Sequence, residues 1–251
     1  MPFSVVIITR DAGLQLEACL GSASFADEIL VVDSGSTDQT LEIAQTMGAR
    51  IIEKDWLGFG RQKQFAVDEA KNDWVLCLDA DERVSDVLKS AILAELAAPR
   101  ANAFTMARRN RFLGRWLRHG EGYPDLSLRL FHRRHARWSE DAVHERIIPD
   151  APPVRLSGDL LHDSAESLDK YLEKQNRYTT LQATQLLADG RKAGFEHLLF
   201  SPLLRFLKFY FLRLGFLDGL PGLIHITIGC MNSFNKYAKL MALTKQAGSA
   251  R

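Results

Sequence analysis

The sequence predicts an α/β protein with a mostly parallel sheet and a C-terminal helical extension. Three observations support this fold class. In the first hundred residues, short apolar runs alternate with segments of helical periodicity, a pattern typical of parallel strands joined by helices. Acidic or hydroxyl residues follow several of the apolar runs directly. After Ser167, apolar residues recur at helical spacing without intervening strand patterns.

The first half of the chain contains alternating expected strands and helices. The expected strands are Phe3–Thr9, Glu28–Asp33, Ala49–Lys54 and Trp74–Asp79. The expected helices are Leu14–Leu20, a segment from a Ser36 cap to Gly48, Arg61–Lys71, and a segment from a Ser85 cap to Leu96. Serine accepts hydrogen bonds from free N–H groups at a helix start, and glycine commonly follows a helix end. Continuous apolar strands connected in this way favour a parallel sheet with helices on both faces.

After Pro99 the alternation becomes less regular. Residues 101–114 and 126–134 are expected to form strands that carry alternating basic residues. Residues 150–159 are interpreted as a loop or a boundary, and a helix is expected from Ser167 to about Leu187.

Length and composition indicate a folded protein of ordinary type. The chain has 251 residues and a net charge of +1, which suits one moderate domain with a smaller appendage. The three cysteines, Cys19, Cys77 and Cys230, are odd in number and widely spaced, so they favour a reducing compartment over a disulfide framework. We expect neither a signal peptide nor a spanning helix, because the apolar runs are too short or interrupted by charge.

Polar side chains follow the expected strands at their carboxyl ends. Thr9 and Asp11 follow the first strand, Asp33 ends the second, and Asp79 and Asp81 follow the fourth. Ligands of open parallel sheets bind beyond these strand ends. Side chains at i and i+2 of an extended chain point to the same side, so the last two carboxylates are expected to converge. Converging carboxylates favour a bound Mg²⁺ or Mn²⁺ that also contacts substrate phosphates; the alternative is an ordinary charged strand exit.

Several other classes of nucleotide- or phosphate-using protein do not fit. The segment after the first strand lacks the G-x-G-x-x-G pattern of dinucleotide-binding enzymes, and the chain has no P-loop. Phosphatases with an aspartate nucleophile carry their D-x-D after the first strand, whereas here it follows the fourth.

Several segments resemble the family-2 inverting glycosyltransferases with the GT-A fold, and more closely the bacterial lipopolysaccharide core β-glucosyltransferases. The resembling segments are SVVIIT, EILVVDSGSTDQT, GFGRQKQFAV, DWVLCLDADERV, RLFHRRHARWSEDAVHE and LLHDSAESLDKYLEKQNRYTTLQA. They cover most of the chain. The sequence departs from the family at Arg10-Asp11, where Asn-Glu is usual.

The resemblance implies a UDP-sugar donor and a divalent cation. Asp33 is expected to accept from the uracil or ribose, Asp79 to lie near the ribose, and Asp81 to bind the metal on the diphosphate. Lys63 is expected to reach the donor, or else to be a solvated helix lysine. The full expected set is Thr9, Asp11, Asp33, Lys63 and Asp79 for the nucleotide-sugar, and Asp79, Asp81 and His162 for Mg²⁺ or Mn²⁺.

Inverting transfer needs a general base that takes the proton of the acceptor hydroxyl. Glu145 is the first candidate, because its VHE segment resembles the family motif. Asp141 and Glu140 are the rivals, and each of the three could instead pair with a nearby arginine. His144 or His162 is expected to complete the metal shell or contact the diphosphate, unless it is structural.

The later part of the chain is rich in basic residues. Arginines suit an anionic acceptor such as the lipopolysaccharide core, or they form a solvated face. Nucleic-acid binding is not expected, because stacking aromatics and a known motif are absent. The arginines concerned are Arg108, Arg109, Arg111, Arg115, Arg118, Arg133, Arg134 and Arg137.

Residues 195–216 combine many Leu and Phe with Arg205, Lys208 and Arg213. This composition predicts a helix that lies in the plane of the membrane, with its basic residues at anionic headgroups. The alternative is a core helix or the interface of a homodimer.

Together these features predict a two-part enzyme. Residues 1–165 form the GT-A nucleotide-sugar-binding and catalytic domain, and residues 166–251 form a helical extension that associates with the membrane. The expected activity is inverting transfer of a hexose, glucose first, from UDP to an inner-core heptose in β-linkage. The expected location is the cytoplasmic leaflet of the bacterial inner membrane. The alternatives are transfer to another lipid-linked or cell-wall glycan, and a catalytically idle membrane adaptor.

Overall fold

The computed structural model describes residues 1–140, 145–163 and 167–249. The chain divides into two compact units. The first comprises Met1–Arg109 and Asp125–Ser164, and the second comprises Asn110–Pro124 and Ala165–Arg251. Each unit is described by itself below.

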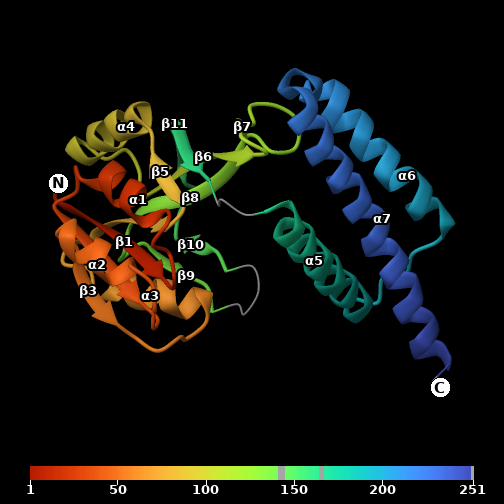
Figure 1. Ribbon diagram of the computed structural model, residues 1–251, viewed down its shortest axis with the longest axis horizontal. Coiled ribbons are helices and arrows are strands. Elements are labelled where there is room, and N and C mark those ends of the chain that lie inside the picture. The colour runs from red at the N-terminus through yellow and green to blue at the C-terminus, as the bar shows by residue number, and fades with distance from the viewer. Residues whose placement is uncertain (141–144, 164–166, 250–251) are drawn as a thin grey trace. The chain divides into compact units, whose positions relative to one another are not determined.

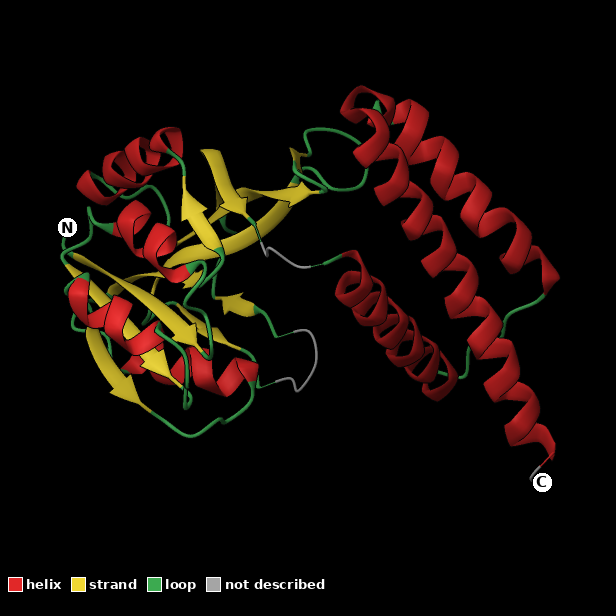
Figure 2. Ribbon diagram, in the orientation of Figure 1, coloured by secondary structure: helices red, strands yellow, loops and turns green. Residues whose placement is uncertain are grey.

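The first unit is built on a sheet whose strands follow the order β3-β2-β1-β4-β8-β6-β11-β5 (Figures 1 and 2). The strands, in chain order, are β1 Phe3–Thr9, β2 Glu28–Asp33, β3 Arg50–Glu53, β4 Trp74–Asp79, β5 Glu82–Val84, β6 Ala103–Phe112, β8 Asp125–His132 and β11 Val154–His162. β1, β2, β3 and β4 pair in parallel. β8 continues the sheet antiparallel to β4. The α/β fold class with a parallel sheet is thereby confirmed.

Two apolar cores cover the two faces of this sheet. Because side chains alternate along a strand, Val5 and Ile7 enter one core and Val6 enters the other. The first core contains helices α1 and α4, and the second contains helix α3 and a short hairpin. The elements concerned are α1 Leu16–Ala23, α3 Phe59–Asp68, α4 Asp86–Ala97, and the hairpin of β9 Ala136–Trp138 and β10 Ile147–Pro149. Burial on both faces explains why the strands read as continuous apolar runs.

Two of the expected helix boundaries are confirmed and one is wrong. Ser85 caps α4, with its hydroxyl accepting from the N–H of Leu88. Gly48 follows α2 (Thr40–Thr46) with a positive φ of 76°. Ser36 does not cap α2, because its hydroxyl instead bonds the Asp33 carboxylate and the N–H of Asp11.

Residues 150–159 are not a loop throughout, because β11 begins at Val154. β11 pairs antiparallel with β5, with Leu160 opposite Val84. Gly158 within this strand has a φ of 91°, and a Cβ there would lie 2.3 Å from the backbone nitrogen of Leu88. The strand therefore packs so closely against the start of α4 that only glycine fits.

We expect Gly158→Ala to lower the free energy of unfolding by about 2–4 kcal/mol, because the added methyl combines backbone strain with a backbone clash. Urea unfolding followed by tryptophan fluorescence measures the loss. Gly48→Ala is the matched control: it has a similar positive φ but nothing within 4 Å of the added Cβ, so it should lose only about 1 kcal/mol. Equal losses in the two variants would contradict the close packing.

The second unit is mainly helical, which confirms the expected helical extension. Helix α5 (Leu168–Ala188) is capped by Ser167, and both α5 and α6 (Phe195–Phe206) pack against α7 (Gly219–Ser249) (Figure 1). Residues 110–124 carry β7 (Arg115–Trp116), which pairs with the end of β6. Buried Asp218 anchors this segment, since its carboxylate accepts from the N–H groups of Arg118 and His119.

The expected continuous helix over residues 195–216 is wrong after Phe206. α6 ends at Phe206, a π-helical turn covers Leu207–Leu212, and a 3₁₀ turn covers Gly215–Asp218. Leu214 between them has a φ of 54°, which no helix continues through. Among the described residues, no single helix has the length and apolar character to cross a membrane. The segments Phe195–Leu212 and Gly215–Ala247, bent by 74°, meet those two criteria only as a pair.

His225 on α7 gives the helical unit a predicted pH dependence. Burial, reinforced by the charge of Arg205 and opposed by Asp218, lowers the pKa of His225 to about 4. The unfolded chain therefore takes up a proton below about pH 6.5 that the folded chain does not. We expect this group to remove about 2 kcal/mol of stability between pH 7 and pH 5. Urea unfolding measures the free energy of unfolding between pH 7 and pH 5. This free energy should fall less in His225→Gln than in wild type or in the control variant His197→Gln. An equal fall in His225→Gln and wild type would contradict the lowered pKa of His225.

Candidate active site

The loops after β1 and β2 are tied together at the carboxyl edge of the sheet. Asp33 is completely buried and accepts from the Thr9 hydroxyl at 2.9 Å and from the N–H groups of Gly35 and Ser36 at 3.0 and 2.8 Å. These contacts fix the shape of loop 34–37. Asp33 and Thr9 thus act on the loop in this structure, and their contact with a nucleotide stays a prediction.

Asp11 joins the two loops from the other side. Its backbone has a φ of 49°, and its carboxylate accepts from the N–H of Thr37 at 2.8 Å. The N–H of Asp11 in turn donates to the Ser36 hydroxyl at 2.8 Å. A short acidic side chain tolerates this backbone region better than most residues, so the exposed Asp11 holds a preformed rim at the sheet edge.

We expected the segment from Asp79 to Asp81 to be extended. It is not, because residues 80 and 81 form a turn between β4 and β5. The Asp79 carboxylate contacts Lys63 Nζ at 3.0 Å through one oxygen and Arg129 at 2.6 Å through the other. Asp81 Oδ2 lies 3.2 Å from His162 Nε2. The two aspartates therefore have different partners, and the extended geometry from which we predicted their convergence is not found.

The Asp79 side chain belongs to a buried charge network. Glu82 is completely buried, accepts from the N–H of Asp79 at 3.0 Å, and contacts Arg129 at 2.6 Å. Burial alone would raise the pKa of Asp79, but the charges of Arg129 and Lys63 outweigh it and hold that pKa well below its usual range. Burial and the Asp79 charge together raise the pKa of Glu82 against the opposing effect of Arg129. The network keeps Asp79 ionised and its position fixed.

The residues that could hold a metal ion are Asp81 and His162. Within the described part of the chain, no group of three or more His, Cys, Asp or Glu side chains could hold a metal by itself. Mg²⁺ and Mn²⁺ bound to nucleotides, however, commonly use one or two protein ligands and take the rest from phosphate and water. A partly exposed carboxylate beside an imidazole fits that limited role. Asp79 is less suited to bind a metal ion, because its carboxylate is already paired with the side chains of Lys63 and Arg129.

Lys63 connects Asp79 with Glu145, the first candidate for the base. Lys63 Nζ lies 3.1 Å from Glu145 Oε1 and 4.7 Å from the centre of the Trp138 ring. The Glu145 side chain is 20% exposed, so part of it is accessible to a substrate. Gly60 permits this arrangement, because a Cβ there would lie 2.2 Å from the Ser139 carbonyl oxygen. Lys63 is therefore a nearly buried site lysine and not a solvated one.

The other candidate catalytic residues of segment 140–145 do not share the position of Glu145. The Glu140 side chain is 78% exposed and lies 3.5 Å from Arg61, which is the geometry of a surface ion pair. Asp141 and His144 lie outside the described residues. Of the expected bases, Glu145 is thus the one that the described structure joins to the strand-end carboxylates.

Arg129 and Glu82 are site residues to which the sequence analysis assigned no role. A signal existed, because Arg129 is a charged residue within the mostly apolar run LSLRLF, directly before the buried Leu130 and Phe131. Two of the arginines that we expected either to bind the acceptor or to form a solvated face are paired with carboxylates within the first unit. Arg108 contacts Asp125 at 2.7 Å, and Arg109 contacts Asp159 at 3.6 Å.

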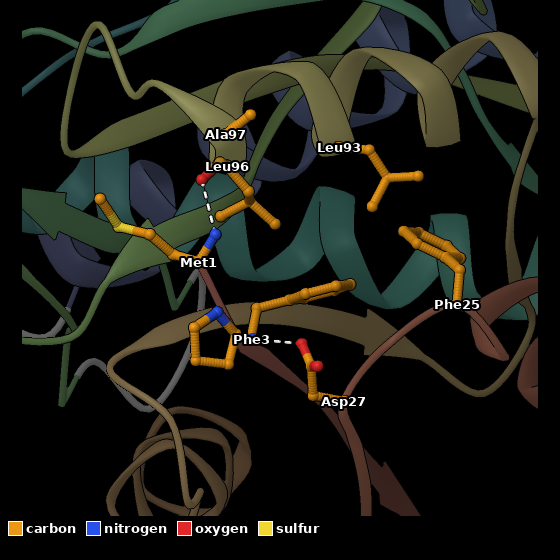
Figure 3. A pocket seen from close by; sticks show the side chains of 8 residues that line it. Met1, Phe3, Phe25, Asp27, Leu93, Leu96 and Ala97 are labelled. Atoms are coloured by element: carbon orange, nitrogen blue, oxygen red, sulfur yellow. Dashed lines mark hydrogen bonds between the residues drawn. The ribbon is translucent and has the colours of Figure 1, made fainter.

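A hollow of about 430 Å³ lies elsewhere in the first unit, between Met1, Phe3, Phe25, Leu93 and Leu96 (Figure 3). It sits at the amino end of β1, where Phe3 N–H donates to Asp27. Ligands of parallel sheets bind at the carboxyl ends of the strands, so this hollow is distinct from the site.

Residues 4–148 match the model of Glycosyl transferase family 2, and the chain belongs to that family.

The relatives extend over nearly the whole chain. The chain is 32% identical to the lipopolysaccharide core biosynthesis glycosyltransferase LpsC of Rhizobium meliloti, covering 96% of this chain and 92% of that protein. It is 30% identical to the uncharacterized glycosyltransferase RP128 of Rickettsia prowazekii, covering 96% of this chain and 87% of that protein. Among solved structures, S. aureus TarS residues 1–349 match with a TM-score of 0.48 and 16% identity over 98% of this chain and 92% of that chain.

Proposed function

We propose that this glycosyltransferase moves a hexose, glucose first, from a UDP-sugar to a heptose of the lipopolysaccharide inner core, with inversion to a β-linkage. The observation that carries the proposal is the array at the carboxyl edge of the sheet, where Lys63 joins Asp79 to Glu145 and Asp81 pairs with His162. The lipopolysaccharide acceptor is supported by the similarity to LpsC.

Inverting transfer on this site needs one carboxylate base. The acceptor oxygen forms a bond to C1 of the donor sugar while the bond between C1 and the diphosphate oxygen breaks, and UDP leaves with that electron pair. The Glu145 carboxylate takes the proton of the acceptor hydroxyl. Lys63, at 3.1 Å, holds Glu145 in position, and Arg129 and Glu82 hold Asp79 beside it.

Asp81 and His162 are the residues that hold the divalent cation in this proposal. A bound Mg²⁺ or Mn²⁺ supplies Lewis-acid neutralisation of the diphosphate charge. The imidazole of His162 lies 3.2 Å from the Asp81 carboxylate and keeps it oriented.

The proposal is tested by incubating the full chain with UDP-glucose, other UDP-hexoses and a deacylated heptose-containing core oligosaccharide. Mass spectrometry detects the added hexose, and NMR of the product identifies the anomeric configuration. A β-linked hexose on heptose supports the proposal. Transfer only to another lipid-linked or cell-wall glycan would replace the acceptor, and no transfer to any acceptor would favour the idle adaptor.

We also propose that the helical unit, residues 166–251, binds the cytoplasmic leaflet of the inner membrane. Apolar side chains on α6 and the turn after it are exposed, and Lys208 and Arg213 lie among them. Such a surface favours contact with lipid and anionic headgroups. The exposed apolar residues are Phe195, Leu199, Phe200, Leu203, Leu204, Leu207, Phe211 and Leu212. Co-sedimentation with anionic vesicles, weaker with zwitterionic ones, is the expected result; a dimer in solution without vesicle binding would favour the homodimer.

A further inference from the structure

A short loop at the carboxyl edge of the sheet exposes two aromatic side chains that have no role in the reaction described above. The loop of residues 54–58 joins β3 to α3, whose first residue is Phe59. Trp56 and Phe59, the aromatic pair, are 44% and 54% exposed, and their rings meet edge to face with centres 4.8 Å apart. Other exposed apolar side chains in the described part of the first unit are aliphatic or Met. Exposed apolar side chains that lie together are a feature of ligand- and partner-binding surfaces.

The loop is held in one shape by Gln62, which is completely buried on α3. The side-chain carbonyl of Gln62 accepts from the N–H of Leu57 at 3.2 Å, and its amide donates to the Ser34 hydroxyl at 3.0 Å. The N–H of Lys54 also donates to the Asp33 carbonyl at 2.8 Å. The loop is thus tied to the strand-end residues of β2, and its order before binding lowers the entropic cost of holding a ligand.

The aromatic pair lies next to the candidate base. Lys63 Nζ is 6.0 Å from the centre of the Phe59 ring and 3.1 Å from Glu145 Oε1, so the ring centre and this oxygen are separated by no more than the sum of the two distances. Gly60, the residue after Phe59, also lies against Glu145, since a Cβ there would be 3.4 Å from the Glu145 Cβ. In the proposed reaction the acceptor hydroxyl lies at Glu145. The sugar residue that carries it, or the next one along the glycan, is therefore within reach of the pair.

The chemistry of the pair suits a sugar ring. The face of an aromatic ring is negative, so it attracts the positively polarised C–H groups on one side of a sugar. A lipid surface is less suitable, because the four charged residues around the pair cancel in sum and provide no excess positive charge for anionic headgroups. These residues are Glu53, Lys54, Asp55 and Arg61.

A nucleobase can also stack on aromatic rings. The residues expected to meet the nucleotide, however, are held in the loops after β1 and β2, where Thr9 donates to Asp33 and Asp11 accepts from Thr37. Phe59 instead lies beside Lys63, which is bound to the base. The position of the pair therefore favours the acceptor over the nucleobase.

We propose that Trp56 and Phe59 form a stacking platform for a sugar residue of the acceptor glycan and help determine which acceptor is glycosylated. This inference rests on the proposed function, because it specifies how the acceptor of that reaction is held. Every residue of the platform and of the base lies in the first unit. A sugar stacked there presents its hydroxyl to Glu145 in a fixed orientation, which favours the transfer.

The test is steady-state kinetics of the full chain with UDP-glucose and a deacylated heptose-containing core oligosaccharide. Trp56→Ala should raise KM for the oligosaccharide about tenfold, because a stacking surface is lost. KM for UDP-glucose and kcat should stay within about twofold of wild type, since the change removes binding that is equal in the ground state and the transition state. Trp56→Phe keeps an aromatic ring and should stay within about threefold of wild type in KM for the oligosaccharide.

Leu57→Ala is the matched control. Leu57 belongs to the same loop and is 42% exposed, but its side chain is aliphatic, and the variant keeps the N–H that donates to Gln62. Its KM for the oligosaccharide should stay within about twofold of wild type, as for most surface substitutions. Thermal unfolding shows whether each variant is folded. Equal KM for the oligosaccharide in Trp56→Ala and Leu57→Ala would overturn the proposal.

The remaining outcomes identify another occupant or another failure. In Trp56→Ala, a raised KM for UDP-glucose alone would assign the rings to the nucleobase. Weaker co-sedimentation with anionic vesicles, with both KM values unchanged, would assign them to the membrane. Either result overturns the proposal. If wild type and Trp56→Ala transfer hexose to the oligosaccharide with the same KM, the inference fails while the proposed function stands. If wild type transfers none, the proposed function fails and the inference fails with it.

Discussion

Replacing Glu145 with glutamine lowers kcat for sugar transfer by about 10²–10⁴-fold, the usual contribution of a general base. The amide keeps the size of the side chain but cannot take the proton of the acceptor hydroxyl. Glu145 is bound at 3.1 Å by Lys63, which holds the carboxylate beside Asp79. Because the change affects the chemical step, KM for the UDP-sugar should change little. Steady-state kinetics with a soluble acceptor oligosaccharide measures both constants.

Glu140→Gln is the matched control for this prediction. It makes the same chemical change five residues earlier, at a side chain that is 78% exposed and forms a surface ion pair with Arg61. Its kcat should stay within about twofold of wild type, in line with the small contribution of such pairs. A large loss in Glu140→Gln or Asp141→Asn, with near-normal activity in Glu145→Gln, would move the base to one of these rivals.

Asp81→Asn is expected to reduce transfer by at least about 10²-fold, because it weakens the site for the cation that neutralises the diphosphate charge. The variant should also need a higher Mn²⁺ concentration for half-maximal activity. Activity is measured across a Mn²⁺ titration and in an EDTA-treated sample. This separates the loss of maximal activity from the higher Mn²⁺ requirement.

Asp163→Asn provides the control for Asp81→Asn. Asp163 follows His162 directly, but its carboxylate faces Arg83 at 3.9 Å. The same loss of charge there should leave the Mn²⁺ dependence unchanged. Full activity in Asp81→Asn would remove the metal assignment, whatever the result for Asp163→Asn.

The parallel half of the fold could be predicted because its pattern is local. β1, β2 and β4 are apolar runs buried on both faces, and their bounds match the expected ones. β11 could not be predicted, because its pairing with β5 is antiparallel and long-range. Gly158, which suggests a turn in the sequence, is instead required by the close packing of β11 against α4. The break of the helix at Leu214 could not be predicted either. Leucine rarely adopts a positive φ, so the residue type at this position does not indicate a helix end.

The site could be predicted in its residue types but not in its pairing. The edge of the sheet and the strand-end carboxylates follow from the order of strands and helices. The partners of Asp79 do not, because they depend on tertiary packing: Lys63 comes from α3 and Arg129 from β8, which lies about fifty residues further along the chain. The turn at residues 80 and 81 could not be predicted either, since the spacing of the two aspartates is equally compatible with an extended chain.

The most direct test of this account is the thermal stability of the full chain with UDP-glucose, measured with Mn²⁺ and again with EDTA. A ligand that binds only the folded state raises the melting temperature. We expect a rise of about 5 °C with UDP-glucose and Mn²⁺ at saturating concentration, little rise with EDTA, and little rise in Asp81→Asn. If no nucleotide or nucleotide-sugar changes the melting temperature under any metal condition, the chain lacks a working donor site and the adaptor alternative takes its place.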